Sequence, residues 1–252
     1  MTLNFISFAI GLCAGIFGGL VGLGGGLIMI PLMVGVLKFS QHKAHGTSLV
    51  ALIFTGISGS ITYAFNSSID IQAAVLLALT AVLTARLGAH YAHTLAEWKL
   101  RKAFGVFLIF CSVLLLLKPY FANAVGVTSG WAKILIFLIA GALTGFLSGM
   151  MGVGGGTIMV PVMVLLAGFT QHVAQGTSLL VMVPAGAIGA FTHWKLGNVE
   201  TDILYGLIPG ILLGTYLGGH FAHIISDDSL RLIFAAIMIL LGFRYVKNSS
   251  PE

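Results

Sequence analysis

The sequence has very few charged residues. Only 8% of its 252 residues are Asp, Glu, Lys or Arg, whereas 58% are hydrophobic and the mean hydropathy is +1.06. A soluble domain carries about 25% charged residues, and so few charges could not cover the surface of a soluble fold of this size. The composition therefore excludes a water-soluble globular protein and predicts an integral membrane protein whose main surroundings are a lipid bilayer.

Other absences exclude further classes of protein. With only two cysteines, Cys13 and Cys111, no disulfide framework or cysteine metal site is indicated. The 12 Lys and Arg residues form no basic tract, which predicts membrane topology signals and no nucleic-acid partner. The sequence contains no GxSxG, HExxH or Walker lysine motif, so we expect neither enzymatic activity nor a cofactor or resident metal.

An internal duplication organises the chain. The stretches GLVGLGGGLIMIP and GMMGVGGGTIMVP begin at Gly19 and Gly149, an offset of 149 − 19 = 130 residues. The same offset aligns the chain from about residue 11 to 104 without a gap and pairs His42 with His172 and His90 with His220. We therefore divide a single membrane domain into a first repeat, residues 1–122, and a second repeat, residues 123–252.

Each repeat contains five apolar stretches. They cover 4–21, 27–38, 45–65, 70–92 and 100–117, and then 134–151, 157–169, 175–194, 201–223 and 229–246. The second stretch of each repeat is too short to cross about 30 Å of hydrocarbon at about 1.5 Å per residue. The fold class predicted is therefore an all-α integral membrane protein, in which the first two segments of each repeat form a short or broken helix pair meeting at a glycine-rich loop.

The positive charges favour one topology. If the first two stretches of a repeat run out and back, most cations share one side of the membrane; these are Lys38, Lys43, Lys99, Arg101, Lys102, Lys195, Arg244 and Lys247. Three fall on the opposite side, namely Lys118, Lys133 and Arg231. The positive-inside rule then predicts that both termini are cytoplasmic. An odd number of crossings per repeat also predicts that the two repeats have inverted topology.

Glycines at every fourth position predict close helix packing. Gly11, Gly15 and Gly19 share one helical face, and Gly141, Gly145 and Gly149 share the equivalent face. Small residues on one face let the backbones of neighbouring helices approach closely. Such faces would also permit a homodimer.

The two glycine runs are the first candidate site. Gly24, Gly25 and Gly26 precede one short stretch, and Gly154, Gly155 and Gly156 precede the other. Glycine adopts backbone conformations closed to other residues, and a helix that starts at such a loop presents unpaired N–H groups to an anion. Two such loops could face one another near the membrane midplane and bind a small anion. The alternative is that the runs only turn a hairpin tightly.

A second repeated motif follows each short stretch. It reads QHKAHGTS in the first repeat and QHVAQGTS in the second, so Thr47 and Ser48 correspond to Thr177 and Ser178. These hydroxyls would either cap the next helix or donate to an oxyanion. The amide of Gln175 could also donate, and its counterpart is His45, so the two repeats are not equivalent there.

Histidine pairs end the fourth stretch of each repeat. His90 and His93 form one pair, and His220 and His223 the other. Residues three apart face the same side of a helix. Such a pair could lie at the membrane interface, carry protons or ligate a metal.

Three further charged residues are candidates. Arg86 lies within the fourth stretch, where it could clamp an anion or extend its charged group to the membrane surface; its counterpart is Tyr216. Asp70 and Glu200 are equivalent residues at the start of the fourth stretches. They join His90 and His220 as candidates for proton coupling.

The motifs resemble those of the TauE/SafE sulfite exporter family, also called the 4-toluene sulfonate uptake permease family. The pattern GxxGxGGG, then Pro, then AxGTS occurs as 19–26, Pro31 and 44–48, and again as 149–156, Pro161 and 174–178. The resemblance implies a secondary transporter in the bacterial inner membrane that carries a small sulfur-containing anion, such as sulfite, a sulfonate or sulfoacetate, with coupling to a proton gradient.

Other functions stay open at the level of the sequence. A divalent-metal or proton carrier would use the His-x-x-His pairs, and an anion channel would need no gradient coupling. A membrane enzyme or assembly factor would show turnover or a partner without flux. The anion and the direction of transport do not follow from the residues.

Overall fold

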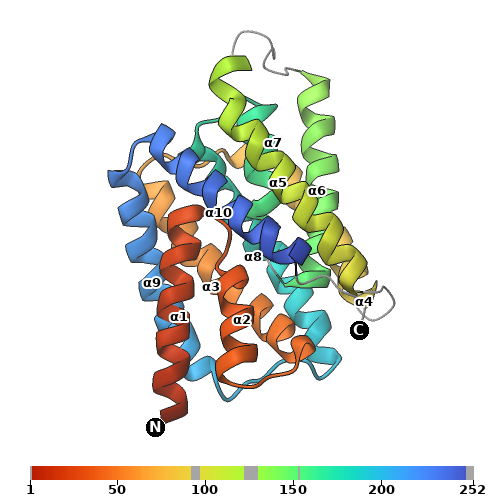
Figure 1. Ribbon diagram of the computed structural model, residues 1–252, viewed down its shortest axis with the longest axis vertical. Helices are drawn as coiled ribbons and strands as arrows, with labels where there is room; N and C mark the ends of the chain where they lie inside the picture. Colours follow the sequence, from red (N-terminus) through yellow and green to blue (C-terminus); the bar gives the residue numbers. More distant parts are fainter. Residues whose placement is uncertain (1, 92–96, 122–129, 153, 248–252) are drawn as a thin grey trace.

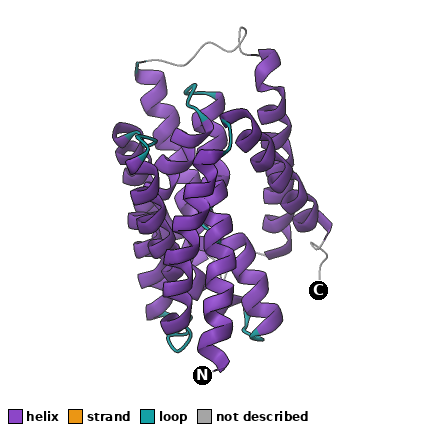
Figure 2. Cartoon of the chain, turned by 90° about the vertical axis from the view of Figure 1, so that its left-hand side faces the viewer, coloured by secondary structure: helices purple, strands orange, loops and turns teal. Residues whose placement is uncertain are grey.

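The computed structural model describes residues 2–91, 97–121, 130–152 and 154–247. All the regular structure in these ranges is α-helical (Figure 2). Their ten helices are α1 (Thr2–Val21), α2 (Gly26–Val36), α3 (Gln41–Phe65), α4 (Ile71–Tyr91), α5 (Glu97–Phe121), α6 (Trp131–Met151), α7 (Gly156–Leu165), α8 (Gln171–Lys195), α9 (Leu204–Ile224) and α10 (Asp227–Lys247).

The helix lengths confirm the all-α membrane class. Within the described ranges, seven helices are long and apolar enough to cross a membrane, namely α1, α3, α4, α6, α8, α9 and α10. The short helices α2 and α7 have 11 and 10 residues, so each covers about half of a hydrocarbon layer of about 30 Å. Figure 1 shows α1 rising from the N-terminus and α2 returning beside it as a hairpin.

Close contacts at glycines bring α1 against α9 and α6 against α4. A Cβ added at Gly11 or Gly19 would lie less than 3.0 Å from a carbonyl oxygen of α9. One added at Gly141 or Gly145 would lie equally close to a carbonyl of α4. The packing predicted from the glycine spacing is therefore confirmed, because these backbones approach too closely for a larger residue.

The central helices α3 and α8 run antiparallel. Gly46, near the start of α3, lies against Asn198 after the end of α8, and Gly176, near the start of α8, lies against Ser68 after the end of α3. Gly206 likewise lies beside Asn4. The start of α1, the start of α3 and the α8–α9 connection therefore share one end of the bundle, which we call the N-terminal end; the opposite end we call the far end.

The third and eighth helices begin one turn earlier than the apolar pattern predicts. We expected starts near residues 45 and 175, with Gly-Thr-Ser at the caps, but α3 starts at Gln41 and α8 at Gln171. The N-caps are Ser40 and Thr170, whose side-chain oxygens accept from backbone N–H groups three residues on. That first turn is polar, so hydropathy misses it. Of the two alternatives for the Gly-Thr-Ser hydroxyls, capping of the next helix is wrong, because Ser40 and Thr170 are the caps.

Candidate functional site

The two glycine loops meet in the interior of the protein. We call Gly22–Gly26, together with Gly152 and Gly154–Gly156, the glycine junction. A Cβ added at Gly156 would lie less than 3.0 Å from the carbonyl oxygen of Gly22, and one at Gly154 equally close to that of Leu23. The starts of α2 and α7, from opposite repeats, therefore lie side by side.

Left-handed backbone conformations shape both loops. In the first loop Gly24 and Gly25 have φ angles of 85° and 76°, and in the second Gly154 has φ of 94°. A residue with a Cβ is disfavoured by about 1–2 kcal/mol in this region. Gly22 and Gly152, with φ of 70° and 62°, follow the ends of α1 and α6. Together these glycines allow the chain to turn into a short helix in each repeat.

The two Gly-Thr-Ser serines fasten each loop to the opposite repeat. Ser178 Oγ shares its single proton between the carbonyl of Gly22 at 2.9 Å and that of Gln175 in its own helix at 2.8 Å. Ser48 Oγ does the same between Gly152 O at 3.0 Å and His45 O at 2.8 Å. Both serines are fully buried. Because these bonds are equivalent under the 130-residue offset, each repeat supports the glycine loop of the other.

The neighbouring threonines make a second equivalent pair of contacts. Thr177 Oγ1 accepts from the backbone N–H of Asp70 at 3.0 Å, and Thr47 Oγ1 accepts from that of Glu200 at 3.0 Å. Asp70 Oδ1 also accepts from the N–H of Ala73 at 2.8 Å, at the start of α4. Glu200 Oε2 pairs with Lys43 Nζ at 2.7 Å. Both acidic candidates thus lie at ends of the bundle, where their backbone N–H groups contact the threonines next to the two junction serines.

The two repeats carry different side chains at one buried position, which is Tyr63 in the first repeat and His193 in the second. The hydroxyl of Tyr63 lies 2.9 Å from Gly19 O and 2.8 Å from the side-chain oxygen of Gln175, and it shares its single proton between these two acceptors. At the position equivalent to Tyr63, His193 bonds through Nε2 to Gly149 O at 3.2 Å. Tyr63 and His193 are buried and were not predicted. A signal for them was present in the sequence: Tyr63 and His193 are equivalent under the 130-residue offset and differ, as His45 and Gln175 do.

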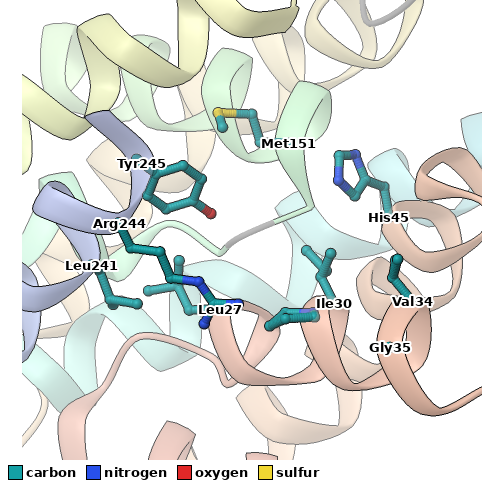
Figure 3. A pocket seen from close by; sticks show the side chains of 10 residues that line it. Leu27, Ile30, Val34, Gly35, His45, Met151, Leu241, Arg244 and Tyr245 are labelled. Carbon is teal, nitrogen blue, oxygen red and sulfur yellow. The ribbon is translucent and has the colours of Figure 1, made fainter. Parts of the chain in front are cut away.

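A cavity of about 270 Å³ opens beside the junction (Figure 3). Its lining comes from α2, α3, α6 and α10, and consists of Leu27, Ile30, Pro31, Val34, Gly35, His45, Met151, Leu241, Arg244 and Tyr245. The inner wall, at Leu27 and Met151, directly adjoins the glycine loops, whereas Gly35 and Arg244 are exposed at its outer part. We call this space the Arg244 cavity; it runs along α2 from Gly35 to Leu27, the residue next to the first glycine loop.

The equivalent region of the other repeat is filled. Val160 and Val164 on α7, which correspond to Ile30 and Val34, are 0% and 1% exposed. Continued beyond residue 104, the 130-residue offset places Leu114 and Leu115 opposite Arg244 and Tyr245, and Leu115 is fully buried. The approach to the junction is therefore open beside α2, whereas among the described residues the side of α7 keeps only a cavity of about 10 Å³ at Gly155 and Met159.

Several candidate residues lie away from this centre. Arg86 and His90 are exposed on α4, and Arg86 does not line the Arg244 cavity. His220 is exposed beside Tyr216, with ring centroids 6.5 Å apart. His223 instead turns inward, with Nδ1 2.7 Å from Gly219 O. The structure therefore does not bring the second histidine pair to one point.

His93 lies outside the described residues. In the part of the chain that the structure describes, no three His, Cys, Asp or Glu side chains come close enough to hold a metal ion together.

The fold and the junction define a multi-pass α-helical membrane protein with two half-length helices that meet in its interior. The chain matches the sulfite exporter TauE/SafE family over residues 7–245, and it belongs to that family.

Curated relatives support the same class. The chain is 27% identical over 266 residues to the probable membrane transporter protein YunE of Bacillus subtilis, covering 96% of each chain. It is 28% identical over 261 residues to a probable membrane transporter protein of Xylella fastidiosa, covering 99% of this chain and 98% of the relative. No solved structure matches the chain. The protein is thus a membrane transporter and not an enzyme.

Proposed function

We propose that the protein is a secondary transporter that moves a small sulfur-containing oxyanion across the bacterial inner membrane by alternating access. One observation carries the proposal: the approach to the glycine junction is open beside α2 and closed beside α7, although the two sides come from repeated sequence. A carrier with related halves needs two such states, in which the open and closed sides exchange.

The anion would be held at the glycine junction in this proposal. The starts of α2 and α7 supply N–H groups that have no partner within their own helices, and their dipoles favour negative charge. Gly24–Gly26 and Gly154–Gly156 would contact the anion. Four hydroxyls now hold the repeats together and would exchange a protein partner for an anion oxygen as the halves move; they belong to Thr47, Ser48, Thr177 and Ser178. Gln175 and His45 would contact the anion from opposite repeats.

The membrane orientation is part of the same proposal. Lys38, Lys43 and Lys195 belong to segments at the N-terminal end, and Gly35 of the Arg244 cavity lies near the end of α2 that leads into them. The positive-inside rule assigns this end to the cytoplasm. Both termini would then be cytoplasmic, the two repeats would insert in opposite orientations, and the cavity would face inward.

Proton coupling completes the proposal. Asp70, Glu200, His90 and His220 remain the candidate proton carriers. Glu200 has the clearest means to couple, because its ion pair with Lys43 joins the second repeat to α3 of the first. Protonation of that carboxylate would weaken the contact between the repeats.

Flux into proteoliposomes tests the function. Purified protein would be reconstituted, and uptake of labelled sulfite followed with and without an imposed pH gradient, with sulfonates and sulfate as competitors. Saturable uptake that follows the gradient supports a coupled carrier. Saturable uptake indifferent to pH retains the carrier and rejects the coupling. Non-saturating flux identifies an anion channel, and the absence of flux from folded protein rejects the proposal.

A variant connects flux to the junction. Gly25→Leu places a side chain on a residue with φ of 76°, against the carbonyl of Ala14. We expect membrane insertion to persist and uptake to be lost. Normal uptake by this variant would remove Gly25 from the site.

A further inference from the structure

We infer that the Arg244 cavity is a binding site for a small organic anion with one charged head group and an apolar body, and that Arg244 recognises the head group. The inference builds on the proposed transport function, but it concerns a different place from the glycine junction and a residue that sequence reasoning treated only as a topology signal.

The charge of the cavity favours an anion. Arg244, His45 and Tyr245 extend toward the same space from α10 and α3 (Figure 3). The lining contains no Asp or Glu. Among the described residues, no carboxylate oxygen lies within 4.0 Å of the Arg244 guanidinium, since the ion pairs found there involve other cations. A guanidinium presents its N–H groups as a planar fork that suits two oxygens of one head group.

The remaining wall favours an apolar body. Leu27, Ile30, Pro31, Val34 and Leu241 form most of the surface opposite the polar groups. The volume of about 270 Å³ lies near the lower end of the range of about 300–1,000 Å³ for small-molecule sites. An inorganic oxyanion would leave this apolar wall in contact with water, whereas an organic anion would cover it.

The Arg244 cavity is specific to one side of the protein, because its polar residues do not recur in the other repeat. The equivalent positions of the second approach carry Leu114 in place of Arg244 and Leu115 in place of Tyr245. An arginine that only anchors a helix end at the membrane surface does not have to line a cavity, but Arg244 does line one. The geometry therefore assigns anion recognition to one side of the protein only.

Equilibrium binding to the purified full-length protein tests the inference. The probes are labelled benzenesulfonate and benzoate, which differ in head group, with sulfite as an anion lacking a body and benzenesulfonamide as a neutral analogue. We expect saturable binding of one or both organic anions, weaker binding of sulfite and none of the neutral analogue. Preference for one of the two organic anions identifies the head group.

Two variants and a control make the test specific. Arg244→Gln should weaken organic-anion binding by about tenfold or more, the scale of a lost hydrogen bond to a charged group. Arg86→Gln, which removes an exposed arginine elsewhere, should bind as the unmodified protein does. Gly35→Leu should also reduce binding, because a Cβ there meets nothing within 4 Å and a larger side chain can enter the mouth without strain.

The outcomes distinguish this inference from the transport proposal. Unchanged binding in Arg244→Gln, equal losses in both arginine variants, or equal binding of benzenesulfonamide would overturn the inference. Sulfite uptake that persists while no organic anion binds would reject this site and leave transport standing. Arg244-dependent binding without uptake of any anion would support the site and reject transport. Size-exclusion profiles confirm that each variant is folded.

Discussion

At the scale of single residues, the junction depends on what glycine lacks. Gly156 has an ordinary helical backbone, yet a Cβ there would collide with the carbonyl of Gly22. Gly25 combines a similar collision with a left-handed φ. One glycine is therefore required by space alone and the other by space and backbone conformation together, and substitutions can separate the two causes.

Gly156→Ala tests the requirement for space. The added methyl group should push the two loops apart, lower the free energy of unfolding by about 1–3 kcal/mol and reduce sulfite uptake. Gly186→Ala is the matched control, because its Cβ would meet neighbours only at 3.6 Å or more. Unfolding in detergent, followed by circular dichroism, gives the comparison. Equal stability of the two variants would contradict the close contact of the loops.

Ser178→Ala tests the hydrogen bond between the repeats. The variant leaves the buried carbonyl of Gly22 without its hydroxyl donor, so we expect a loss of about 1–3 kcal/mol in the free energy of unfolding. Ser60→Ala is the control, since Ser60 Oγ donates at 3.1 Å to Ile57 O in its own helix. Stability is measured by the same unfolding experiment. A larger loss in the free energy of unfolding for Ser60→Ala than for Ser178→Ala would contradict a stabilising bond between the repeats at Ser178.

At the scale of helices, glycine and threonine replace bulky side chains at the interface between α4 and α6. Gly145 lies against the carbonyl of Ala81, and Thr84 Oγ1 donates to the carbonyl of Ala142 at 2.7 Å. Thr80 makes the corresponding bond to Leu138 O at 2.7 Å, one turn away. In lipid, packing and such bonds hold helices together because no hydrophobic driving force acts between them.

Gly145→Ile should separate α4 from α6. The branched side chain meets the backbone of α4 and has no flexible neighbour to displace, so we expect a loss of more than about 3 kcal/mol in the free energy of unfolding, or no folded protein. Leu143→Ile, on the exposed face of the same helix, should stay within about 0.5 kcal/mol. Yield and monodispersity in detergent would show the difference; well-folded Gly145→Ile would contradict the packing.

At the scale of the whole molecule, the two repeats adopt related but unequal arrangements. The serine and threonine bonds recur in both repeats at the same offset. The cavity does not recur, because Arg244 and the exposed Gly35 line an open space beside α2, whereas the buried side chains of Leu115 and Val164 occupy the corresponding space beside α7. A shared framework with one open side is the arrangement that alternating access requires.

Cysteine accessibility tests this asymmetry. In a background with Cys13→Ala and Cys111→Ala, we expect Val34→Cys to react with a membrane-impermeant maleimide from the cytoplasmic side. The equivalent Val164→Cys should react slowly from either side, because Val164 is 1% exposed. Equal reactivity at both positions would mean that the open and closed sides do not differ, and reaction of Val34→Cys only from outside would reverse the proposed orientation.

The sequence by itself determined the membrane class, the helical fold, the duplication, the short helices α2 and α7 and the glycine packing faces. The duplication follows from matching motifs 130 residues apart. Composition and local periodicity suffice for the other features, because each of them depends on residues close together in the chain. The sequence misplaced the starts of α3 and α8, whose first turns are polar and are held by Ser40 and Thr170.

Only the tertiary structure decided which faces meet. Ser178 finds Gly22 and Tyr63 finds Gln175 across more than 100 residues of chain, and no local pattern encodes such partners. Arg86, the candidate clamp, is exposed on α4, whereas Arg244, a terminal cation by sequence, lines the cavity. The physical reason is that periodicity shows which side of a helix is apolar, but the packing of all helices together determines which polar groups share an enclosed space.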